Sequence, residues 1–197
     1  MSKVLIAIIT DELIHYKVVG VLAQILLNNK KHELDTCVSA MRGIGEHRNK
    51  MVTTFLEGDY DYLLFIDADN PPPPNVLDLI DLDKEVIGLP TPIQMSPIQG
   101  LNEMFWNVFG EDDLPTKKSG QGLQEVNMVG SGVMLIKRNV LEKIENPFTT
   151  VRNGADLRIV GTDMAFCKKC KEQNIKIYTH WDYKCDHYKT INLSTLT

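Results

Sequence analysis

The chain has 197 residues, of which 43% are hydrophobic, and a formal net charge of −5. A chain of this length folds as one domain and can bury a sizeable core. The small acidic charge argues against a protein that binds nucleic acids or membranes through its overall charge. The charge is uneven, because residues 1–136 carry 10 Lys/Arg against 19 Asp/Glu, whereas residues 137–197 carry 11 against 7. This distribution suits a metal site facing an anionic ligand, and equally suits helices with charged outer faces.

The first half of the chain alternates short apolar runs with helical patterns. The runs predict strands over Val4–Ile9, Leu34–Ser39, Tyr62–Ile66 and Glu85–Leu89. The helical patterns cover Glu12–Asn29, Glu46–Glu57 and Val76–Ile80. This alternation predicts one α/β domain over residues 1–197, with a mostly parallel central sheet flanked by helices.

The second half is less regular. Residues 91–125 contain scattered Gly, Pro and Gln, so we expect a loop-rich insertion there. Regular patterns then resume, and they predict strands over Val126–Ile136 and Lys176–Thr179 and helices over Asn139–Glu145 and Asp163–Asn174.

The cysteines and the hydropathy pattern bear on the compartment. Cys167 and Cys170 have CxxC spacing, but no second pair completes a zinc set, which favours free thiols in a reducing compartment. No apolar stretch reaches about 18 residues, and the first residues enter a strand pattern rather than a signal peptide. We therefore expect a soluble protein without a membrane span in the cytoplasm, which is the host cytoplasm if the chain is viral.

The most informative motif ends the third predicted strand. Asp67 and Asp69 follow an apolar run, and Asn70 and four prolines come next. In an extended chain these two side chains point to the same side, about 6–7 Å apart. Two carboxylates that close repel each other unless a cation lies between them, and Mg²⁺ takes one or two carboxylates together with phosphate oxygens. Because open α/β sheets bind ligands at this end of their strands, the motif predicts a metal–diphosphate site, with a solvated acidic turn as the alternative.

Four further features have both a functional and a structural interpretation. The run Gly130-Ser131-Gly132 either lets a sugar or diphosphate lie against bare backbone or forms a packing bulge. Asp163 is either a carboxylate base or a helix-terminal carboxylate. His187 suits an ion such as Mn²⁺ beside carboxylates, although a lone His is usually not a ligand. Arg48 suits phosphate or a planar base, or it faces solvent from its helix.

In chain order, these motifs resemble the A-type glycosyltransferases, particularly the broad family 2 group and its small single-domain members encoded by bacteriophages. The matching stretches are residues 47–49, 62–74, 84–90, 129–138, 161–167 and His187. They run from about residue 40 to residue 188 and are interrupted by the 91–125 insertion. The ordered set is far more specific than any single motif.

The resemblance implies a role for each site residue. Asp69 would ligate Mn²⁺ or Mg²⁺, Asp67 would contact the ribose or support the metal, and His187 would complete the metal site. His187 would act from a C-terminal segment, residues 180–197, that closes the site. The residues implied to bind the nucleotide-sugar are Thr10, Asp11, Arg48, Asp67, Gly130, Ser131 and Gly132.

The resemblance also assigns a base. Asp163 matches the acidic residue that acts as base in inverting members. This chain has Thr162-Asp163 where the family commonly has Glu-Asp, so inversion is favoured but retention stays open. The chain also lacks the family's usual Pro-x-Tyr/Phe-Asn pattern near its start, which leaves the base-binding residues open.

These observations predict a metal-dependent glycosyltransferase that moves a sugar from a nucleotide-sugar donor to a hydroxyl acceptor. The acceptor is a cell-envelope glycan or a modified DNA base, and the sequence names neither the sugar nor the oligomeric state. A sugar-phosphate nucleotidyltransferase is the alternative enzyme, but Thr10-Asp11-Glu12 is acidic where a glycine-rich basic loop would be needed. A non-catalytic domain that binds a sugar or nucleotide is the third interpretation.

Overall fold

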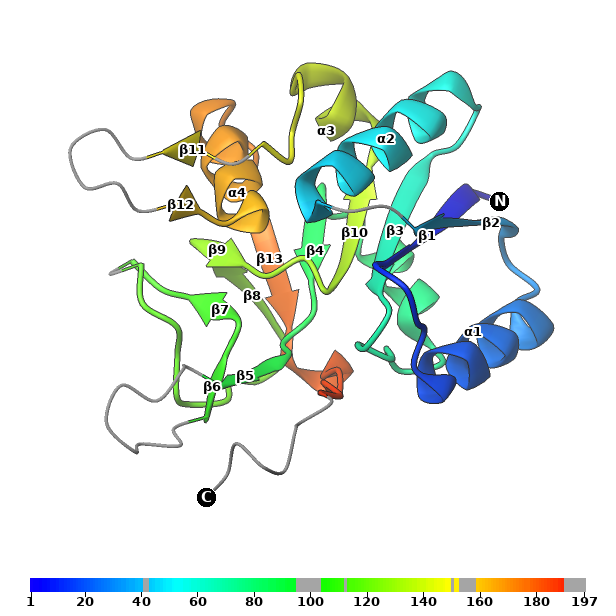
Figure 1. The fold of residues 1–197 in the computed structure, drawn as a ribbon, viewed down its shortest axis with the longest axis horizontal. Helices are drawn as coiled ribbons and strands as arrows, with labels where there is room; N and C mark the ends of the chain where they lie inside the picture. The colour runs from blue at the N-terminus through cyan, green and yellow to red at the C-terminus, as the bar shows by residue number, and fades with distance from the viewer. Residues whose placement is uncertain (41–42, 95–103, 112, 150, 153–158, 190–197) are drawn as a thin grey trace.

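The computed structural model describes residues 1–40, 43–94, 104–111, 113–149, 151–152 and 159–189. Its centre is a seven-stranded sheet with the order β2-β1-β3-β10-β4-β13-β8 (Figure 1). The strands are β1 (Lys3–Thr10), β2 (Glu33–Ala40), β3 (Tyr62–Asp67), β4 (Val86–Gly88), β8 (Leu123–Val126), β10 (Val133–Lys137) and β13 (Ile177–His180). Only β10 and β8 run against the other five, so the predicted α/β fold with a mostly parallel sheet is confirmed.

Helices cover both faces of this sheet (Figure 1). One face packs against α2 (Ile44–Glu57), α3 (Arg138–Lys143) and α4 (Thr162–Glu172). The other packs against α1 (Tyr16–Asn28) and the 3₁₀ helix η1 (Val76–Leu82). Strands β1 and β3 are apolar at almost every position because they are buried between the two helical layers.

The described part of the 91–125 segment consists of short strands and turns. Strand β5 (Pro92–Gln94) pairs with β6 (Met104–Trp106), and β7 (Val108–Phe109) pairs with β9 (Met128–Val129). The segment ends in β8, which lies at one edge of the main sheet. Residues 95–103 and 112 of the predicted insertion lie outside the described residues. A second small hairpin joins β11 (Val151–Arg152) to β12 (Ile159–Val160).

The continuous strand predicted over Val126–Ile136 is wrong, because residues 130–132 separate β9 from β10. The reason is a close approach of other side chains to the backbone. A Cβ added to Gly130 would lie 2.6 Å from Asn107 Nδ2, and one added to Gly132 would lie 2.5 Å from Asn70 Oδ1. The glycines therefore let the chain pass directly against two buried asparagines.

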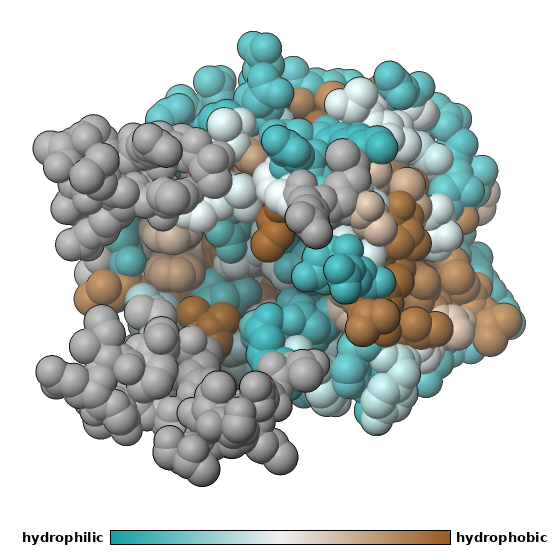
Figure 2. Space-filling model, viewed as in Figure 1, coloured by the Kyte–Doolittle hydropathy of each residue, from teal (hydrophilic) through white to brown (hydrophobic). Residues whose placement is uncertain are grey.

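Three surface and interior features complete the fold. All four cysteines are free thiols, and three of them are buried. No helix within the described ranges is long and apolar enough to cross a membrane. Apolar side chains gather on the surface over α1 (Figure 2), where Leu27 is 80% exposed and Tyr16 is 70% exposed.

Candidate active site

A cleft of about 970 Å³ opens at the carboxyl end of β3, the edge where an open α/β sheet binds ligands. Its walls come from parts of the chain that are far apart in sequence: the start of α2, the turn after β3, residues 130–132, the start of α4, and the C-terminal segment. It contains most of the predicted site residues, namely Arg48, Asp67, Asp69, Gly130, Ser131, Gly132, Asp163 and His187.

Thr10 and Asp11 line a smaller adjoining hollow of about 280 Å³, which shares Asp67 and Asp69 with the main cleft. The Thr10 hydroxyl donates to the Leu13 carbonyl oxygen at 2.8 Å, which fixes the chain as it leaves β1. The wall of this hollow also includes His47, which is 2% exposed, and neither of its ring nitrogens has a partner among the described residues. An unpaired buried imidazole is costly, so His47 is a functional candidate that the sequence interpretation left without a role.

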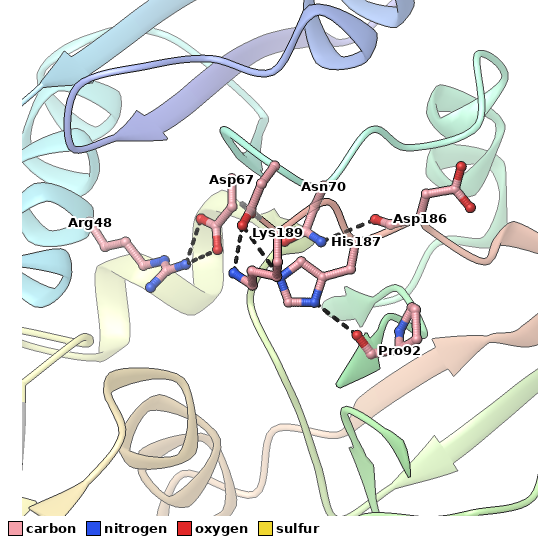
Figure 3. Close-up of polar contacts among 8 residues, drawn as sticks. Arg48, Asp67, Asn70, Pro92, Asp186, His187 and Lys189 are labelled. Atoms are coloured by element: carbon pink, nitrogen blue, oxygen red, sulfur yellow. Dashed lines mark hydrogen bonds and ion pairs between the residues drawn. The ribbon is translucent and has the colours of Figure 1, made fainter. Parts of the chain in front are cut away.

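Arg48 and Asp67 form a partly buried ion pair (Figure 3). The Arg48 Nη2 atom donates to both Asp67 carboxylate oxygens, at 2.7 and 2.9 Å, and Nη1 donates to Thr162 Oγ1 at 3.4 Å. Arg48 is only 3% exposed, so it does not face solvent as an ordinary helix residue would. The structure places its guanidinium on Asp67, and its predicted contact with the nucleotide stays a prediction.

Burial raises the pKa of Asp67 to about 6, and Arg48 offsets this effect only in part. The neighbouring carboxylates of Asp69 and Asp163 push this pKa in the same direction as burial does. The three acids are therefore close enough to interact electrostatically. A bound cation would relieve their repulsion.

Asp69 faces His187, and both residues line the cleft. The His187 Nδ1 atom lies 2.8 Å from the Pro92 carbonyl oxygen, and because a carbonyl only accepts, Nδ1 carries the proton. The other ring nitrogen, Nε2, lies 3.4 Å from Asp69 Oδ2. In a neutral ring Nε2 presents a lone pair to the carboxylate, whereas in a protonated ring Nε2 donates a hydrogen bond to it, so the two groups need a proton or a cation between them.

Lys189 supplies a positive charge at this point. Its Nζ lies 2.6 Å from the same Asp69 Oδ2 atom. Burial of Asp69 alone would raise its pKa, but the hydrogen bonds from His187 and Lys189 outweigh burial and lower the pKa to about 2. Asp69 is therefore ionised at neutral pH. Sequence analysis did not single out Lys189, whose only signal was its position two residues after His187.

The residues at this site supply part of the ligand set that a divalent cation needs. No three or more His, Cys, Asp or Glu side chains surround one point in the described part of the chain. The reason is that Asp67 is paired with Arg48, whereas Asp69 and His187 face each other. A carboxylate and an imidazole whose tautomer is fixed by a backbone carbonyl are suitable ligands for Mn²⁺. Such a set leaves coordination positions for diphosphate oxygens and water.

The C-terminal segment is attached to the turn that carries the two aspartates. The Asn70 Nδ2 atom donates to the Asp186 carbonyl oxygen at 3.1 Å, and the Tyr188 backbone N–H donates to the Asp69 carbonyl oxygen at 2.9 Å. The Tyr188 ring also stacks on His15, with centroids 4.0 Å apart. These contacts hold His187 in place. Residues 190–197 of the predicted closing segment lie outside the described residues.

The remaining predicted residues form the wall and the far side of the cleft. Ser131 is 1% exposed, and its Oγ has no partner within the described residues, so the wall combines bare backbone with one unpaired hydroxyl. Asp163 lies in the first turn of α4 and lines the cleft, and its Oδ1 accepts from the Met164 backbone N–H at 2.9 Å. This bond fits a helix-terminal carboxylate, and the location fits a base, so both interpretations of Asp163 stay open.

Comparisons with known proteins found matches among solved structures only. No protein-family model matches the chain, and no curated protein matches it. Among solved structures, A197 from STIV superposes with a TM-score of 0.66 at 22% sequence identity, over 95% of this chain and 86% of that one.

Two further structures contain nucleotide ligands. GalNAc-T7 with UDP, GalNAc and Mn²⁺ matches with a TM-score of 0.54 at 9% identity, over 97% of this chain but only 44% of that one. A UDP-glucose pyrophosphorylase complexed with UDP-glucose matches with a TM-score of 0.53 at 12% identity, over 95% and 92% of the two chains. At these identities the similarity shows a shared fold.

Proposed function

We propose that this chain, which has the A-type fold of the nucleotide-diphospho-sugar transferases, is a metal-dependent glycosyltransferase acting on a hydroxyl acceptor. The observation that carries the proposal is the convergence of Asp69, His187 and Lys189 at the carboxyl end of β3. A carboxylate, an imidazole and an ammonium at one point are groups suited to hold a cation and a diphosphate.

The leaving diphosphate would bind at this point. A divalent cation, Mn²⁺ or Mg²⁺, held by Asp69 and His187 would supply charge that stabilises the departing nucleotide diphosphate. In the nucleotide-bound protein, the Lys189 ammonium would move from Asp69 to a phosphate oxygen. Arg48 would keep Asp67 oriented toward the ribose, since its guanidinium already fixes both carboxylate oxygens. The nucleoside would extend into the smaller hollow beside Thr10 and Asp11.

The sugar and the acceptor would occupy the larger cleft. The sugar would lie against the 130–132 backbone, where the Ser131 hydroxyl has no partner among the described residues. Asp163 would take the proton from the acceptor hydroxyl in an inverting reaction. General-base catalysis of this kind contributes typically about 10²–10⁴-fold.

The proposal specifies the acceptor only as a molecule that offers a hydroxyl. A cell-envelope glycan and a modified DNA base both offer a hydroxyl, and the excess of Lys/Arg over Asp/Glu in residues 137–197 is compatible with the second. We propose the cytoplasm as the place of action, because all four cysteines are free thiols.

A sugar-phosphate nucleotidyltransferase is the second candidate, and the match to a UDP-glucose pyrophosphorylase favours it. That reaction requires a basic, glycine-rich loop to hold the triphosphate of the incoming nucleotide. In this chain Asp11 and Glu12 follow β1, and both are exposed. Repulsion between these carboxylates and a triphosphate makes sugar transfer the better-supported function.

Calorimetry followed by a donor-hydrolysis assay tests the proposal. The wild-type protein should bind UDP or another nucleoside diphosphate only with Mn²⁺ present, and it should slowly hydrolyse the matching nucleotide-sugar. Asp69→Asn should lose this binding while keeping the wild-type circular dichroism spectrum. Formation of a nucleotide-sugar from a nucleoside triphosphate and a sugar phosphate would instead establish the second candidate. Binding without any turnover of a panel of donors would indicate a non-catalytic domain.

A further inference from the structure

Helix α1 is apolar around most of its circumference. Its inner side is part of the core, where Val18 is fully buried and Ile25 is 1% exposed. Its outer side is also apolar, with Tyr16 70% exposed and Leu27 80% exposed. A helix that is apolar all round is normally buried, and monomers rarely leave such a continuous face open to water. Figure 2 shows this face as a group of apolar side chains on the surface.

The outer face has the spacing of a helix–helix seam. Tyr16, Gly20, Ala23 and Leu27 follow one another at intervals of four, three and four residues, and all four positions are exposed. This is the a/d repeat by which one helix packs along another. Val19 and Leu26 widen the seam on one side, with exposures of 53% and 41%.

Gly20 adds a second observation. It lies in the middle of α1, where glycine lowers helix stability relative to alanine. A Cβ added at this position would meet no atom within 4 Å, so the packing of this chain does not require a glycine there. Together with Ala23, Gly20 leaves a shallow area at the centre of the seam, which allows another helix to approach closely.

We propose that the outer face of α1 is a homodimer interface, in which two copies of the helix pack antiparallel about a two-fold axis between Gly20 and Ala23. The seam is self-complementary under this symmetry, as a two-fold interface must be. Each Tyr16 lies opposite Leu27 of the second copy, and each Gly20 lies opposite Ala23. Large residues therefore meet at the two ends, and small residues meet at the crossing point.

The charges at the helix ends favour this partner and this orientation. Exposed Asp11 and Glu12 precede α1, and exposed Lys30 and Lys31 follow it, with Lys31 also paired to Asp81 at 2.8 Å. Antiparallel packing brings the acidic end of one copy beside the basic end of the other at both ends of the interface. A parallel pair would put like charges together, and an anionic membrane surface would repel the acidic end.

Sedimentation equilibrium of the full chain tests the proposal. The wild type should be a dimer, and Leu27→Glu should raise the dissociation constant by roughly 100-fold or more, because each dimer contains the substitution twice. Gly20→Leu should also give a monomer, because it blocks the close approach of the second helix, whereas within the isolated chain a Cβ at this position meets no atom within 4 Å. Both variants should keep the wild-type circular dichroism spectrum, since neither residue belongs to the core.

Leu114→Glu is the matched control. Leu114 is 63% exposed, and it precedes Pro115, which bridges to Phe109 in β7, on the opposite side of the molecule from α1 (Figure 1). This variant should remain dimeric.

A wild-type protein that is monomeric at its highest soluble concentration would overturn the proposal. Flotation with phosphatidylglycerol vesicles would not change that conclusion. Flotation of that monomer would show that α1 binds lipid. A dimer that survives both Leu27→Glu and Gly20→Leu would place the interface elsewhere and overturn the proposal too.

Discussion

The ion pair between Arg48 and Asp67 leads to a quantitative prediction about the stability of the protein. Replacing Arg48 by Met would leave the Asp67 carboxylate without its partner at the base of the cleft. Breaking a fully buried pair in this way costs about 3–5 kcal/mol. The Asp67 side chain is 27% exposed and water can partly replace the guanidinium, so we expect a loss of about 2–3 kcal/mol of unfolding free energy.

A double-mutant cycle separates the interaction energy between Arg48 and Asp67 from the other effects of each substitution. Asp67→Asn should cost less than Arg48→Met, because burial already disfavours the ionised carboxylate and the amide still accepts one hydrogen bond, although the buried guanidinium loses its counter-charge. The double variant Arg48→Met/Asp67→Asn should lose less than the sum of the two single losses, with a coupling of at least about 1 kcal/mol.

Urea unfolding followed by circular dichroism, without nucleotide or metal, measures each variant. Lys143→Met is the control, since it removes one positive charge from an exposed helix position and should change the stability by at most about 0.5 kcal/mol. Strictly additive losses in the cycle would show that Arg48 and Asp67 do not stabilise each other, and would refute the reasoning.

Three further predictions concern the rest of the site. Asp163→Asn should keep donor affinity while transfer falls by roughly 10²-fold or more; near-normal transfer in a rate assay would leave Asp163 only its helix-terminal role. Lys189→Met should raise the Mn²⁺ affinity of the nucleotide-free protein about two- to fivefold, because the ammonium no longer occupies Asp69; an unchanged affinity by calorimetry would show that the two cations do not compete. Gly132→Ala should lose about 1–3 kcal/mol in urea unfolding, because its Cβ would lie 2.5 Å from Asn70 Oδ1. A Gly132→Ala variant as stable as the wild type would contradict the close packing.

The elements that sequence analysis predicted well are those decided by local patterns. Strands β1 and β3 were predicted to within one residue at each end, because a short, wholly apolar run has few alternatives. The start of α1 was predicted at Glu12, but the helix begins at Tyr16. The difference arises because Thr10 holds the Leu13 carbonyl and the His15 ring accepts from the Lys17 backbone N–H. Hydropathy patterns do not reveal such side-chain caps.

In the site, too, features set by residues close together in the sequence were predictable, whereas contacts between residues far apart in the sequence were not. The aspartate pair was visible because Asp67 ends β3 and Asp69 lies two residues later, and both line the cleft, while their predicted role with a metal stays a prediction. Two pairings could not be predicted: that of Asp67 with Arg48, 19 residues earlier in the chain, and that of Asp69 with Lys189, 120 residues later. Both depend on the assembled sheet and on the docking of the C-terminal segment, which no local spacing encodes.

The central claim is that Asp69 and His187 together hold a divalent cation beside a nucleotide diphosphate. A crystal structure of the protein with Mn²⁺ and UDP, with the metal located by its anomalous scattering, tests this claim most directly. We predict Mn²⁺ directly coordinated by an Asp69 oxygen and by His187 Nε2, with the Lys189 ammonium moved from Asp69 to a phosphate oxygen. UDP bound in the cleft with Lys189 still on Asp69, and with no anomalous peak beside Asp69 and His187, would contradict the account.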